Sequence, residues 1–149
     1  MKFDPEVFYL AALMHDLGLV DPYDGAGSFE INGAQGAHKF LLSEQYDSER
    51  ADVVHEAIAL HTSVGKADKG SAEGALVHYG AGMDVMGFRA EDLSVTTREA
   101  IVAAWPRNNF KIDFTRILQE QVKAKPECHI AGLMGLGFPH KLAGAPFKE

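Results

Sequence analysis

The chain has 149 residues, of which 46% are hydrophobic and 23% charged, a balance that fits a globular domain with a substantial core. Its 14 basic and 21 acidic side chains give a net charge of −7, which argues against a nucleic-acid surface, because phosphate binding depends on clustered Lys and Arg. The apolar run over residues 8–14 is far too short to span a bilayer, so no membrane association is expected.

The spacing of apolar residues predicts helices throughout, and no alternating strand pattern of any length is present. The first helix begins at Asp4, an N-cap followed by Pro5, and runs to about residue 17. A turn-rich loop covers residues 19–28. Further helices are predicted over residues 29–44, 48–61, 72–83, 96–104 and 109–124. After Pro126 we expect a helical turn and then an extended tail. The pattern therefore predicts a single all-α domain.

Four of the predicted helices carry titratable side chains on an apolar stripe, where burial is costly unless a partner is present. These side chains are His15 with Asp16 beside it, His38, His61 and Asp84. If the helices form one bundle, their inward faces converge and these groups meet. Imidazoles and carboxylates together are ligands of Zn²⁺, Fe and Mn²⁺. We therefore expect a divalent metal, Zn first, with Fe or Mn as alternatives; a purely structural hydrogen-bonded cluster is the competing interpretation.

Other polar residues are assigned to less specific roles. His55 and His78 lie off the apolar stripes and are predicted to be surface or boundary histidines. Thr62, next to His61, either supplies a hydrogen bond to the site or caps its helix. The single cysteine, Cys128, cannot form an internal disulfide, and no signal peptide is visible, so the expected compartment is the cytoplasm.

The pair His15–Asp16, followed much later by Asp84, resembles the motif of the HD-domain superfamily, helical metal-dependent enzymes of which many are phosphohydrolases. Further segments resemble the cyanamide hydratase branch of that superfamily and occur in the expected order, from about residue 6 to about residue 126. They are residues 28–34, 37–42, 56–62, 79–87 and 105–110. The resemblance implies one HD-type helical bundle over residues 1–149, in which residues 127–149 form a C-terminal segment rich in Gly and Pro.

The resemblance also implies roles for individual residues. His15, Asp16 and Asp84 would bind the metal, while His38 and His61 would line the same pocket, as proton carriers or as additional ligands. The implied activity is a hydro-lyase that adds water to cyanamide or a related small nitrile by means of a metal-bound hydroxide. The alternatives are a phosphohydrolase of nucleotides or phosphomonoesters, a di-iron oxygenase, and a catalytically inactive HD-like module. The expected partner is a small-molecule substrate, and a homo-oligomer is compatible with the sequence.

One feature departs from the family pattern, which has a further histidine ligand on a helix before the His–Asp pair. Only 14 residues precede His15, and none of them is histidine. Either the chain starts late, so that the bundle lacks its first helix, or His38 or His61 takes the place of that ligand.

Overall fold

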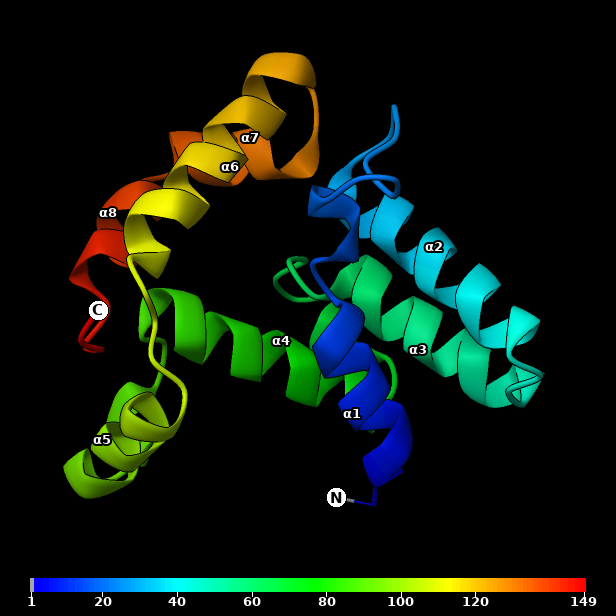
Figure 1. Cartoon of the computed structure of the whole chain (residues 1–149), viewed down its shortest axis with the longest axis horizontal. Coiled ribbons are helices and arrows are strands. Elements are labelled where there is room, and N and C mark those ends of the chain that lie inside the picture. The colour runs from blue at the N-terminus through cyan, green and yellow to red at the C-terminus, as the bar shows by residue number, and fades with distance from the viewer. Residues whose placement is uncertain (1) are drawn as a thin grey trace. The chain divides into compact units, whose positions relative to one another are not determined.

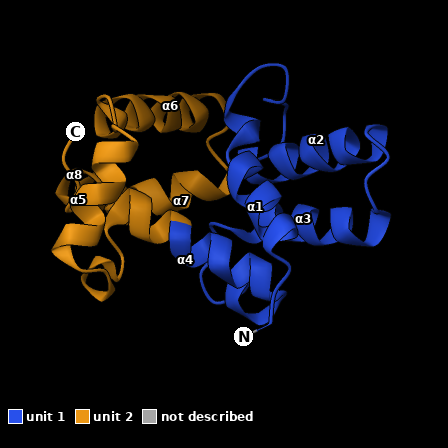
Figure 2. Ribbon diagram, turned by 60° about the horizontal axis from the view of Figure 1, so that its bottom comes forward, with its two compact units in different colours: residues 1–80 blue, residues 81–149 orange. Residues whose placement is uncertain are grey.

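A computed structural model describes residues 2–149. Every regular element in this range is a helix, so the predicted all-α class is confirmed. The chain divides into two compact units, Met1–Gly80 and Ala81–Glu149, and the division falls inside helix α4 (Ala72–Met86), as Figure 2 shows. Over the described residues, none of the helices combines the length and the apolar character that crossing a membrane requires.

The first unit is built from α1 (Pro5–Met14), α2 (Phe29–Ser43), α3 (Ser48–Leu60) and the beginning of α4, and α2 and α3 lie side by side (Figure 1). Two short 3₁₀ turns, η1 (Leu17–Leu19) and η2 (Ala67–Lys69), connect these helices. The first helix was predicted to run to residue 17, but it ends at Met14. Asp16 leaves the helical conformation, with φ −102° and ψ 12°, and the chain turns there into η1.

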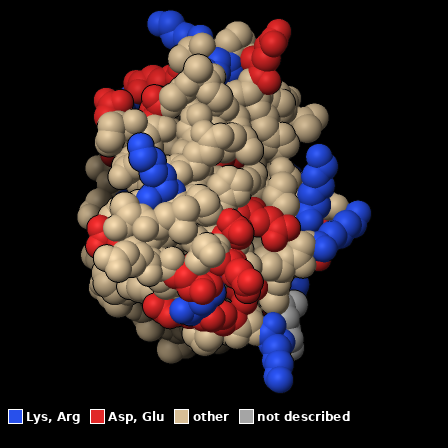
Figure 3. All heavy atoms as spheres, turned by 90° about the vertical axis from the view of Figure 1, so that its right-hand side faces the viewer, with Lys and Arg blue, Asp and Glu red and all other residues tan. Residues whose placement is uncertain are grey.

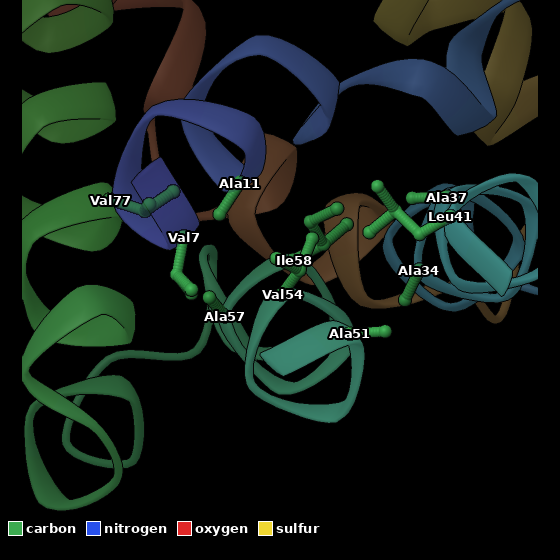
Figure 4. Close-up of a cluster of buried hydrophobic side chains, with 10 residues drawn as sticks. All are labelled: Val7, Ala11, Ala34, Ala37, Leu41, Ala51, Val54, Ala57, Ile58 and Val77. Carbon is green, nitrogen blue, oxygen red and sulfur yellow. The ribbon is translucent and has the colours of Figure 1, made fainter. Parts of the chain in front are cut away.

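The core of the first unit consists mainly of small side chains (Figure 4). Its buried members are Val7, Ala11, Ala34, Ala37, Leu41, Ala51, Val54, Ala57, Ile58 and Val77. Alanines at facing positions let the helices approach closely, and the β-branched and leucine side chains fill the space that is left.

The predicted stripes agree with this core in part. His61, at the end of α3, is buried as the predicted stripe requires, together with Ile58 and Val54, one and two turns before it. On α1 the core-facing residues are Val7 and Ala11, whereas the predicted stripe that ends in His15 lies half-buried at the edge. Because α1 is apolar on nearly every side, its sequence alone does not single out the buried face.

The start of α1 is fixed by its N-cap. One carboxylate oxygen of Asp4 accepts hydrogen bonds from the backbone amides of Glu6 and Val7, at 3.0 and 3.3 Å. Arg50 of α3 donates to the same carboxylate through both Nε and Nη2 and also pairs with Glu6. The hydrogen bond from Arg50, followed by the one from the Val7 amide, outweighs desolvation and lowers the pKa of Asp4. In Figure 3, Asp and Glu side chains gather around one basic side chain in the lower half of the face.

This arrangement predicts an acid-sensitive contribution to stability. Because the pKa of Asp4 is lower in the folded chain than its ordinary value of 3.8, the contribution is present above pH 3.8 and is lost as the pH falls through the folded value. Urea unfolding of the wild type should therefore show a fall in stability below that pH. Arg50→Gln should be less stable at neutral pH and should show a smaller acid-induced fall. If the free energy of unfolding fell equally steeply with decreasing pH in both proteins, Arg50 would not be the cause of the acid sensitivity.

The second unit holds the end of α4, the 3₁₀ turn η3 (Ala90–Asp92), α5 (Val95–Ala104), α6 (Phe110–Ala124), α7 (His129–Gly135) and α8 (Phe138–Gly144). The segment after Pro126 was predicted to be a helical turn followed by an extended tail. The helical start agrees with α7, but the extended tail is wrong, since the chain continues into α8. Ile130 and Leu142 of these helices are almost fully buried. Gly137 separates the helices at φ +90°, a conformation that favours glycine.

Candidate metal centre

Three of the predicted site residues meet in the first unit. His15 directly follows the last residue of α1, Asp16 precedes η1, and His61 directly follows the last residue of α3. Each offers one ligand atom, and these atoms all lie within 4.8 Å of one another. The ends of two helices and the turn between α1 and α2 thus bring together two imidazoles and a carboxylate.

Both histidines are anchored in the same way. Nδ1 of His15 donates to the carbonyl oxygen of Ala12 at 2.8 Å, and Nδ1 of His61 donates to the carbonyl oxygen of Ile58 at 2.7 Å. Carbonyl groups in the last turn of a helix lack intrahelical donors, so a histidine that follows the helix can supply one. Each hydrogen bond assigns the Nδ1 proton and leaves Nε2 as the position that can bind a metal.

The Asp16 carboxylate lies between the two Nε2 atoms. Oδ2 is 3.4 Å from Nε2 of His15, and Oδ1 is 3.5 Å from Nε2 of His61. The two rings meet edge to face, with centroids 5.1 Å apart. A neutral imidazole with its proton on Nδ1 turns a lone pair toward the carboxylate, which is unfavourable unless a proton or a metal cation is shared between them. The donor set therefore fits a divalent cation, and two imidazoles with one carboxylate suit Zn²⁺, Fe or Mn²⁺.

The electrostatics keep Asp16 available as an anion. Desolvation acts to raise its pKa, but the interaction with His61 and then with His15, whose rings favour the carboxylate whenever Nε2 carries a proton, outweighs it, so the pKa of Asp16 lies below its ordinary value. The His61 side chain is only 4% exposed, whereas those of His15 and Asp16 are 25% and 32% exposed. A cation or a small ligand can therefore reach the group from the side of His15 and Asp16.

Neighbouring residues hold the group in place. The ring of Phe29 contacts that of His61 with centroids 5.6 Å apart, which provides an apolar wall. Nδ1 of His78 donates to the carbonyl oxygen of His61 at 2.7 Å, so the half-buried His78 supports the end of α3. Gly18 of η1 packs against the backbone of Phe29 and Gly33 in α2. The turn that carries Asp16 is therefore held directly against α2.

The structure does not bring His38 into this group. Its Nε2 lies 2.8 Å from Oδ1 of Asp52, and its ring contacts that of the half-buried His55 with centroids 5.7 Å apart. Desolvation, together with the charge of His38, lowers the pKa of His55. The roles of His38 as proton carrier or additional ligand stay predictions.

Asp84 belongs to the second unit, near the end of α4. Its carboxylate forms an ion pair with Arg107, whose guanidinium also contacts the rings of Phe110 and Phe147. The assignment of Asp84 as a metal ligand stays a prediction.

Glu30 was not among the predicted site residues. This residue lies in the first turn of α2 and is only 2% exposed. An acidic residue in a first helical turn is usually explained by the favourable helix dipole, so the sequence carries no distinctive signal for its burial.

Comparison with known proteins gives one family. No curated protein matches the chain. The family model described as HD domain matches residues 1–105, which is more than two thirds of the 149 residues. The matched span contains His15, Asp16, His38, His61 and Asp84.

Proposed function

The chain belongs to the HD-domain family, and from this we propose that it is a metal-dependent enzyme that adds water to cyanamide or a related small nitrile. Membership in this family supports a metal-dependent enzyme, since these domains are mostly metal-dependent hydrolases that bind divalent cations. The observation that carries the proposal is the convergence of two Nε2 atoms and the Asp16 carboxylate on one position.

In this proposal each residue has one defined task. A bound divalent ion supplies Lewis acidity and lowers the pKa of a coordinated water toward neutrality. Because Nδ1 of His61 is bonded to the carbonyl oxygen of Ile58, only its Nε2 can bind a metal or carry a proton, and it cannot do both at once. Its contact with Asp16, beside His15, favours the role of ligand. Asp16 supplies the negative charge that holds the cation.

The proposed reaction is an addition without a change of oxidation state. The oxygen of water forms a bond to the nitrile carbon and one of its protons passes to the nitrile nitrogen, which gives an isourea. Transfer of the remaining hydroxyl proton to that nitrogen then gives urea as the product of cyanamide. The ring of Phe29, which contacts His61, supports a small, uncharged substrate, because an apolar wall stabilises charged groups poorly. Hydrolysis of nucleotides or other phosphomonoesters is the second candidate, and family membership favours it.

The proposal is tested by metal analysis and product assays on one purified sample. We expect one zinc per chain and release of urea from cyanamide, with activity lost after chelation and restored by zinc. Phosphate release from a nucleotide or from p-nitrophenyl phosphate, without urea, would favour the second candidate. Two irons per chain would favour an oxygenase, and a chain that binds no metal would favour an inactive module.

A further inference from the structure

Glu30 is a buried carboxylate with one identified hydrogen-bond donor. Its Oε1 lies 2.7 Å from Oγ1 of Thr62, which directly follows His61. Its Oε2 is buried and has no hydrogen-bond partner among the described residues. Burying such a group lowers stability unless its interactions compensate, so its position needs an explanation beyond packing.

The hydrogen bond has a defined direction. An ionised carboxylate only accepts, so the hydroxyl proton of Thr62 is donated to Glu30. Glu30 lies in the first turn of α2, and an acidic side chain is favoured at this end of a helix by the unpaired backbone amides.

The Glu30–Thr62 bond lies beside a second contact between the same two elements. Phe29 and Glu30 are neighbours at the start of α2, and His61 and Thr62 are neighbours at the end of α3. The ring of Phe29 contacts His61, while the carboxylate of Glu30 binds Thr62. Two consecutive pairs thus join α2 to the turn that carries a candidate metal ligand.

We propose that Glu30 is a positioning residue of the metal centre, acting through Thr62. Through the hydrogen bond to Thr62 it holds the turn in which His61 sits. This inference rests on the proposed function. It deepens that proposal by naming a residue outside the convergent group that keeps the candidate ligand His61 in position.

The test measures the zinc dissociation constant of the full chain by competition with a chelator, which requires no turnover. Glu30→Gln and Thr62→Val should each raise the constant on the order of 10–100-fold, as is typical when a partner of a ligating histidine is disturbed. The double variant should bind zinc no more weakly than the weaker single variant, because both changes act on one bond: glutamine weakens it by removing the charge of the acceptor, and valine removes its donor. Thr62→Ser keeps the hydroxyl and should restore the wild-type constant.

Glu73→Gln is the matched control. Glu73 is also a buried glutamate of the first unit, and its Oε1 accepts from the backbone amide of Asp4 at 2.6 Å. This variant should bind zinc like the wild type. Equal zinc affinity of Glu30→Gln and wild type, or multiplying effects in the double variant, would overturn the inference. Thr62→Val tests the same bond if Glu30→Gln does not fold.

The two proposals fail in different ways. A wild type that binds zinc but releases no urea would contradict the proposed function, while the zinc titrations would still decide the role of Glu30. A wild type that binds neither zinc, iron nor manganese would overturn both.

Discussion

Asp16→Asn is expected to remove stoichiometric zinc from the purified chain. The Asp16 carboxylate contacts Nε2 of both His15 and His61, and it supplies the only negative charge of the convergent group. Asparagine keeps the size of the side chain but loses that charge. Removing one member of a close charged pair costs about 3 kcal/mol, so the zinc dissociation constant should rise on the order of 100-fold.

Asp52→Asn is the control for this substitution. Asp52 also pairs with a histidine, His38, but lies outside the convergent group. The control should therefore retain one zinc per chain. Zinc content by elemental analysis and affinity by chelator competition measure both variants. Retention of equimolar zinc by Asp16→Asn would show that the ligand set is wrong.

Gly18→Ala is expected to lower the free energy of unfolding by about 3 kcal/mol, the upper part of the range for overpacking. A Cβ at this position would overlap the carbonyl oxygen of Phe29 and lie 2.7 Å from the amide nitrogen of Gly33. Both are backbone atoms of α2, so relief requires η1 to move away from the helix. Since η1 directly follows Asp16, zinc affinity should fall as well.

Gly80→Ala provides the opposite expectation. Gly80 lies within α4, and a Cβ there meets nothing within 4 Å. The variant should be more stable by about 0.5–1 kcal/mol, because alanine loses less backbone freedom in a helix than glycine does. Urea unfolding monitored by circular dichroism measures both variants. Equal stability of Gly18→Ala and Gly80→Ala would contradict the close approach of η1 and α2.

The sequence predicts the helices well because their limits are marked locally. Asp4 with Pro5, and the Gly-rich loop before Phe29, are signals that short-range chemistry explains. The helices after Pro126 were missed because their stability comes from burial of Ile130 and Leu142, and a composition rich in Gly and Pro conceals that contribution.

The candidate site was predictable to the extent that its residues stand out on apolar stripes. His15, Asp16 and His61 do so, and they meet. His38 stands out in the same way, but its ring pairs with Asp52, fourteen positions further along the chain on the neighbouring helix α3. The spacing of apolar residues cannot reveal such a contact between two helices. Glu30 could not be found, because its hydrogen-bond partner Thr62 lies 32 positions away in the chain, in the turn after α3.

The position of both histidines at helix ends also bears on how fast a bound ion could escape. Each imidazole depends on a carbonyl of the last turn of its own helix, at Ala12 or Ile58. Helix ends fray by local opening far more often than the whole fold opens. Release of the ion would therefore follow the opening of a single turn, and its residence time would report on the local stability of α1 and α3 rather than on global unfolding.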